Sequence, residues 1–140
     1  MAHAVRRLDA SGIATAQEVL TRFHRSEVSA AYVKSILDNV ANLLLVAEES
    51  GKVIGFLFAH WIDRLPVEQR QLFIYEIEVA LEHRRKGAAS ALVSAALGYA
   101  RARGARSFVF TNHSNPAATG LYRKLGGKAK NGDDLLFVFS

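Results

Sequence analysis

Apolar residues recur with two different spacings along this chain. In residues 13–23 and 32–40 they fall three or four positions apart, which is typical of helices with one buried face. Residues 43–48, 53–62 and 72–79 are instead short runs rich in Leu, Val, Ile and Phe, which are typical of strands. The pattern therefore predicts two helices followed by three strands. The middle strand is apolar on both faces and is expected to be central in the sheet.

Polar residues mark where the first two helices begin. Asp9 or Ser11 is placed to cap a first helix that runs to about His24. Ser29 is placed in the same way to cap a second helix over residues 30–39. These caps agree with the helical spacing of the apolar residues.

The second half of the chain mixes both kinds of element. We expect a helix over residues 87–103, a strand over 107–111, a short helix over 116–125 and a closing hairpin over 128–139. The strand–helix–strand unit over 72–111 is expected to be a right-handed parallel crossover. The order of elements predicts an α/β chain that forms a single domain over residues 1–140.

Composition excludes several classes of site. The chain has no cysteine, so it has no disulfide, no thiolate nucleophile and no Cys-based zinc site, and its five histidines show no paired spacing for a metal. It contains neither a run of about 18 apolar residues nor the features of a signal peptide. We therefore expect a cytoplasmic protein with no metal and no membrane partner.

The net charge of +5 at pH 7 suggests an anionic partner. The basic residues cluster at 84–86, 101–106 and 123–130, but they form no tail, and no stacking aromatic residues lie between them. The sequence therefore favours a phosphorylated small molecule over a nucleic acid.

The basic cluster over residues 84–90 joins a predicted strand to a predicted helix. A helix N-terminus carries unpaired N–H groups and a partial positive charge, and Gly87 with its small neighbours lets an anion come close to the backbone. One interpretation is a cradle for a pyrophosphate. The other is an ordinary strand-to-helix turn with a solvated basic cluster, and the spacing alone leaves both open.

Glu76 and Glu78 are the most informative polar residues in the apolar strands. At positions i and i+2 their side chains share one face of the sheet. Two carboxylates on a covered face are expected only where that face opens onto a cleft. The alternative is a pair of exposed acids on a solvated face.

Three motifs together resemble the Gcn5-related N-acetyltransferases (GNAT). They are Arg84-Arg85-Lys86-Gly87-Ala88-Ala89, the apolar strand 72–79 before it, and the helix Asn115-Pro116-Ala117 to Leu121-Tyr122-Arg123-Lys124-Leu125-Gly126. The resemblance implies an acyl-CoA N-acyltransferase fold, in which about four helices flank a central, mixed, twisted sheet of six to seven strands.

Within that family the chain is most similar to the type I aminoglycoside 3-N-acetyltransferases. The similar stretches are residues 73–79, 82–87, 115–117 and 121–126. The chain departs from that group by carrying Glu76 and Asn115 where the group has Asp. The segment between the first two helices also looks shorter, and this segment helps to shape the acceptor pocket in the family.

The resemblance implies transfer of an acetyl group from acetyl-coenzyme A to a primary amine by direct attack. It implies Glu76 for amine binding or as the base, Glu78 as a second acid, and Tyr122 as the acid that protonates the leaving thiolate. It also implies a set of donor-binding residues, whose backbone N–H groups matter more than their side chains: Ile77, Val79, Arg84, Arg85, Lys86, Gly87, Ala88, Ala89, Ser90, Asn115 and Ala118. Besides the two glutamates, the candidate acceptor-binding residues are His24, Tyr75, His113, Asp133 and Asp134.

Each of these residues also has a structural interpretation. Asn115 is equally suited to capping a helix, Tyr122 could be a core aromatic residue, and the histidines could be ordinary surface residues. The best-guess acceptor is an aminoglycoside acetylated at its 3-amino group, an activity that gives antibiotic resistance. The alternatives are another amine (a polyamine, an amino acid or a protein N-terminus) and a non-catalytic coenzyme A-binding module. A homodimer is a further expectation from the family.

Overall fold

The computed structural model describes residues 3–24, 26–130, 132–133 and 135–139. The chain folds into two compact units, Met1–Phe110 and Thr111–Ser140, each with its own internal contacts. The first unit contains the sheet and most of the helices, and the second contains one helix.

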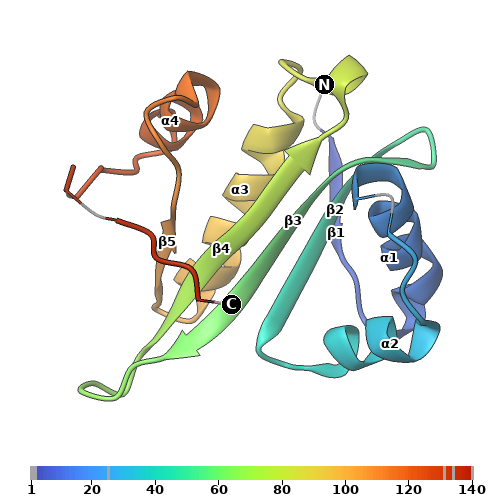
Figure 1. Ribbon diagram of the computed structural model, residues 1–140, viewed down its shortest axis with the longest axis horizontal. Coiled ribbons are helices and arrows are strands. Elements are labelled where there is room, and N and C mark those ends of the chain that lie inside the picture. Colours follow the sequence, from blue (N-terminus) through green and yellow to red (C-terminus); the bar gives the residue numbers. More distant parts are fainter. Residues whose placement is uncertain (1–2, 25, 131, 134, 140) are drawn as a thin grey trace. The chain divides into compact units, whose positions relative to one another are not determined.

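A five-stranded mixed sheet forms the first unit (Figure 1). Neighbouring strands are antiparallel except for the last pair, which is parallel. The strands lie in chain order across the sheet: β1 (Ala4–Arg7), β2 (Asn42–Glu49), β3 (Lys52–Asp63), β4 (Arg70–Val79) and β5 (Arg106–Val109). The predicted central strand is therefore correct, because β3 pairs along its length with β2 and β4.

Three helices cover the two faces of this sheet. Helices α1 (Ile13–Val19) and α2 (Ala30–Asp38) lie on one face, and α3 (Ala88–Ala102) lies on the other (Figure 1). The predicted cap of α2 is present, because the Ser29 side chain accepts a hydrogen bond from the Tyr32 amide. The Asp9 side chain accepts one from the Ser11 amide and so caps the 3₁₀ turn that leads into α1, while α1 itself follows Gly12. Short turns of 3₁₀-helix lie at Ala10–Gly12 and Leu81–His83.

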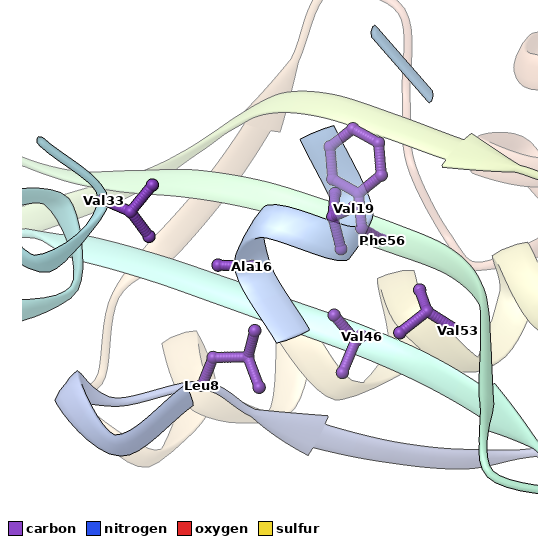
Figure 2. Packing of buried hydrophobic residues seen from close by; sticks show 7 residues of the cluster. All are labelled: Leu8, Ala16, Val19, Val33, Val46, Val53 and Phe56. Carbon is purple, nitrogen blue, oxygen red and sulfur yellow. The ribbon is translucent and has the colours of Figure 1, made fainter. Parts of the chain in front are cut away.

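Apolar side chains from the strands and helices make a core on each face of the sheet. Figure 2 shows the cluster on the α1 and α2 face, where Ala16, Val19 and Val33 from the helices meet Val46 and Phe56 from the sheet. The residues that alternate with these along β2 and β3 are also buried, as the period of two in a strand requires when both faces are covered.

The second unit contains α4 (Pro116–Lys124), which begins as its sequence predicts. Pro116 occupies the first turn, and the Asn115 side chain accepts a hydrogen bond from the Ala118 amide at 3.1 Å. The predicted closing hairpin over 128–139 is wrong for the residues described, because none of them is in a strand. The sheet of the described chain accordingly has five strands, not six or seven. The apolar run at 135–139 has the composition of a strand, but a strand also needs a hydrogen-bonded partner, which composition does not provide.

Candidate functional site

A β-bulge in β4 decides which way its glutamates point. The ladder pairs Ile74 with Ala59 and Glu76 with Phe58, which leaves Tyr75 as an extra residue in β4. A one-residue insertion exchanges the two faces for every residue that follows it. Both predicted carboxylates therefore lie on the face covered by α1 and α2, while the buried Leu72 and Ile74 lie on the α3 face.

A pocket of about 290 Å³ lies between this face of the sheet and the helices α1 and α2. We call it the Glu76 pocket, because Glu76 is the only carboxylate among its described lining residues. Its lining residues come from both helices, from the turn after α1 and from the three central strands: Ala16, Val19, Leu20, His24, Tyr32, Val33, Ile36, Leu37, Leu44, Phe56, Phe58 and Glu76.

The end of the first helical segment brings His24 to Glu76. Instead of continuing as an α-helix, residues Leu20–His24 form a π-helical turn, a geometry that is common at functional sites. His24 Nε2 lies 3.2 Å from Glu76 Oε2, and the imidazole packs edge-on against Phe56 with 5.7 Å between ring centroids. Both side chains are a little over one third exposed, so this pair forms the solvent-facing end of the pocket.

Unlike Glu76, Glu78 and Tyr75 are not among the described lining residues of the Glu76 pocket. Glu78 pairs with Phe56 across the ladder and is half-buried, but it is not a lining residue of the Glu76 pocket. Tyr75 is 59% exposed, and its ring contacts the rings of His60 and Phe73. The two glutamates share a face as expected, and only Glu76 contributes to the pocket.

His60 is a polar residue near this pocket that the sequence did not single out. The amide nitrogen Nδ2 of Asn42 donates to the Ile36 carbonyl oxygen at 3.0 Å, which turns the amide oxygen toward His60 Nδ1 at 2.8 Å. His60 Nδ1 therefore carries the hydrogen, and Nε2 has the free lone pair. Burial lowers the pKa of His60 below its usual 6.5 despite the opposing charge of Glu76, so this imidazole is neutral at pH 7.

The loop over residues 84–90, which we call the 84–90 loop, is built to expose its backbone. Gly87 precedes α3 with φ of 91° and ψ of 1°, in the left-handed region that suits glycine. Arg85 also has a positive φ, of 62°, which is uncommon for a residue with a side chain. Among the described residues no side chain caps α3, so the N–H groups of its first turn point outward as an anion site requires.

Side-chain contacts from distant parts of the first unit hold this loop and the turn before it. Arg84 Nε donates to the Val79 carbonyl oxygen at 3.0 Å, so this side chain connects the loop to the end of β4. The other contacts are His83 Nδ1 with Glu49 Oε2 at 3.0 Å, Arg22 Nη2 with Glu82 Oε1 at 2.7 Å, and His3 Nε2 with the Lys86 carbonyl oxygen at 2.7 Å.

The edge of β4 beyond Ile74 is open on one side. The parallel ladder to β5 ends at the pair Ile74 and Val109, whereas the ladder to β3 continues to Val79. Within the described strands, residues 75–79 therefore have a partner on the β3 side alone. Ile77 and Val79 lie in this stretch, and their backbone groups are the ones for which the sequence predicted a donor-binding role.

The second unit contains the remaining candidates. Burial raises the pKa of the half-buried Tyr122 phenol above 10, so it stays protonated at neutral pH. Ala118 lies in the first turn of α4, and its amide donates to the Asn115 side chain. His113 and Asp133 are exposed, and Asp134 lies outside the described residues.

Two kinds of feature were not predicted from the sequence. Apolar lining residues such as Leu37 and Phe58 have the spacing of a helix or a strand, which predicts positions in the core and not in a pocket wall. The bulge at Tyr75 and the π-helical turn over Leu20–His24 have no residue signature of their own.

Two further features of the described residues bear on partners. None of their helices is long and apolar enough to cross a membrane. In the same ranges, no group of three or more His, Asp or Glu residues is arranged to hold a metal ion.

Comparison with known proteins gives matches over most of the chain. A model of the Acetyltransferase (GNAT) family matches residues 13–127. An uncharacterized N-acetyltransferase of Bacillus subtilis strain 168, YhfO, is 31% identical over 129 residues, covering 89% of this chain and 87% of the relative. Human N-acetyltransferase 8B is 34% identical over 108 residues, covering 76% of this chain and 47% of that protein, so the chain spans about half its length.

Solved structures match the fold over nearly the whole chain. An aminoglycoside acetyltransferase from an uncultured soil metagenomic sample superposes with a TM-score of 0.85 at 28% identity, covering 99% of this chain and all of that one. A second one from such a sample, in complex with sisomicin, gives a TM-score of 0.90 at 17% identity, covering 99% of this chain and 95% of that one, and at this identity it shows the fold alone.

Proposed function

Because its family model covers residues 13–127, this chain belongs to the acetyltransferase (GNAT) family, and we propose that it acetylates a primary amine of a small molecule. The donor in this family is generally acetyl-coenzyme A. The observation that carries the proposal is that one strand, β4, has two suitable features. Its Glu76 side chain lies in a pocket, while the edge of residues 75–79 that faces away from β3 has no strand partner among the described residues.

The donor site is proposed at the 84–90 loop and the open edge of β4. The outward N–H groups at the start of α3 suit a pyrophosphate. The backbone groups of residues 75–79 that face away from β3, other than the Val79 carbonyl bound by Arg84, suit an extended amide-containing arm and a thioester carbonyl. Acetyl-coenzyme A would supply the acetyl group as a thioester, whose C–S bond breaks as the new C–N bond forms. Side chains of Arg84, Arg85 and Lys86 are expected to add less than the backbone does.

The acceptor site is proposed at the polar end of the Glu76 pocket. An amine reaches a protein as an ammonium ion at pH 7 and must lose a proton before its nitrogen can attack. The Glu76 carboxylate, 3.2 Å from His24 Nε2, is placed to bind the ammonium ion, and the pair is proposed to take up that proton. Glu78 is proposed as a second acid that acts from outside the pocket.

Tyr122 is proposed as the acid that returns a proton to the departing sulfur. Burial raises the pKa of its phenol, which keeps the proton available at neutral pH. Asn115 and Ala118, at the start of the same helix, are proposed to contact the donor.

Aminoglycosides are the acceptor class that the similarities suggest, because the motifs resemble type I 3-N-acetyltransferases and the solved structure at 28% identity is that of an aminoglycoside acetyltransferase. They therefore form the first test panel. Polyamines, amino acids and protein N-termini form the second panel. A cytoplasmic location and a homodimer stay predictions from the sequence.

The test is to incubate the protein with acetyl-coenzyme A and these amines while following free thiol. Thiol release that depends on an amine, with an N-acetylated product seen by mass spectrometry, is expected. Binding of coenzyme A without turnover of any amine would favour a non-catalytic coenzyme A-binding module.

A further inference from the structure

We infer that the acceptor in the Glu76 pocket is a monoamine with an apolar body, such as an alkylamine or arylalkylamine, and not a polycation. The inference rests on the proposed acetyl transfer and assigns the class of its acceptor. It is argued from the chemistry of the pocket lining.

The lining is almost entirely hydrocarbon. Nine of the twelve residues are aliphatic or Phe, which leaves Tyr32, His24 and Glu76 as the polar ones. Apolar lining residues such as Val33 and Phe56 are only 3% exposed, whereas the Glu76 and His24 side chains are more than one third exposed. The pocket therefore has an apolar inner part and a single polar end.

The charge of the pocket fits one ammonium group. In the part of the chain that the structure describes, Glu76 is the only carboxylate that lines the pocket, and an imidazole already lies 3.2 Å from it. An acceptor with several ammonium groups would have to bring the others against hydrocarbon, where an unpaired charge is strongly disfavoured. Hydroxyl groups of a sugar ring would likewise lose water without gaining partners along the inner wall.

The volume of the pocket also favours a small acceptor. Its volume of about 290 Å³ lies at the low end of the range for ligand pockets, roughly 300–1,000 Å³. A phenyl ring or a short alkyl chain suits such a space. With its ammonium group at Glu76, the body of the acceptor would extend toward Val33 and Leu37.

The length of an alkyl chain gives a quantitative test. Each methylene buried in an apolar pocket is expected to raise kcat/KM about fourfold. From ethylamine to hexylamine, kcat/KM should therefore rise steadily and then level off where the pocket ends. 2-Phenylethylamine should be turned over at least ten times more efficiently than sisomicin or spermidine.

Leu37→Ala should reduce the gain per methylene, because it removes hydrocarbon from the inner wall. Val40→Ala is the matched control, since Val40 lies just after the same helix, is 75% exposed and does not line the pocket. The melting temperature should fall for Leu37→Ala, because Leu37 packs against the core, and should stay close to the parent's for Val40→Ala. The KM for acetyl-coenzyme A should stay close to the parent's in both variants, which separates an acceptor effect from a general loss of fold.

The same amines are also titrated by calorimetry without acetyl-coenzyme A, so that binding is measured apart from turnover. Affinity that rises with chain length supports the inference even if no amine is acetylated, and in that case the proposed function is what fails. Turnover that is independent of chain length, or that is best with sisomicin, overturns the inference and leaves the proposed function standing. If no amine binds and none is acetylated, both are wrong.

Discussion

The 84–90 loop and the Glu76 pocket lie in the same unit of the chain, but they present different atoms to a ligand. The loop offers backbone N–H groups, exposed by the left-handed conformation of Gly87 and by the missing side-chain cap of α3. The pocket offers side chains brought together from two helices, one turn and three strands. A donor site made of backbone can stay the same while the acceptor site changes residue by residue. We therefore expect substitutions to affect the two substrates separately.

Glu76→Gln should give the largest effect and should act on the acceptor side alone. Removing the carboxylate removes both the partner of the ammonium group and the proposed base, so kcat/KM for the amine should fall by about 10²-fold or more. The KM for acetyl-coenzyme A should change little, because the 84–90 loop is untouched. The measurement is steady-state kinetics by thiol release.

Glu78→Gln is the matched control for this substitution, because Glu78 lies on the same face of β4 but outside the pocket. It should reduce turnover less than Glu76→Gln does. The reverse order would show that the other carboxylate is the important one.

Tyr122→Phe should lower kcat about tenfold or more while leaving the affinity for coenzyme A nearly unchanged. The phenol oxygen is the proposed proton source, whereas the half-buried ring is retained. Kinetics for kcat and calorimetry for coenzyme A affinity measure the two quantities. An unchanged kcat would exclude Tyr122 as the acid.

Gly87→Ala should affect the binding of acetyl-coenzyme A and not the binding of the amine. A side chain in the left-handed region costs about 1–2 kcal/mol, so the loop should either lose that much stability or change its conformation. The KM for acetyl-coenzyme A should then rise about five- to thirtyfold, since 1.4 kcal/mol corresponds to a factor of ten. Acceptor kinetics at saturating donor should stay close to the parent's.

Gly98→Ala is the control for this loop substitution. Gly98 lies within α3 with no positive φ, and an added methyl group would meet nothing within 4 Å. This change should stabilise the protein by about 0.5–1 kcal/mol, because alanine favours a helix interior over glycine. Equal effects of the two substitutions on the KM for acetyl-coenzyme A would contradict a specific role for the Gly87 backbone.

Arg84→Ala should have the smallest effect. Arg84 Nε donates to the Val79 carbonyl oxygen, so its loss should cost about 1 kcal/mol in the free energy of unfolding. The KM for acetyl-coenzyme A should change by less than about threefold, as it should for Lys86→Ala, whose side chain is exposed. A tenfold rise in either variant would assign the pyrophosphate to side chains and not to the backbone.

Sequence patterns predicted the 84–90 loop much better than the Glu76 pocket. Small residues and glycine at a strand-to-helix junction report backbone geometry directly, which is why the turn at Gly87 and the caps at Ser29 and Asn115 were predicted. The pairing of Glu76 with His24 was not, because it depends on a bulge and a π-helical turn that only the packed structure reveals. The predicted strand at 135–139 is wrong for a related reason, since a strand requires a partner as well as the right residues.

The most direct test of the account is the initial rate of thiol release by the parent protein, with acetyl-coenzyme A and 2-phenylethylamine varied together. Direct attack by an amine bound in the Glu76 pocket on a donor held at the 84–90 loop requires both substrates at once. The account predicts release that depends on both substrates and double-reciprocal plots that intersect. Parallel plots, which indicate an acetylated enzyme intermediate, or release that is independent of the amine, would contradict it.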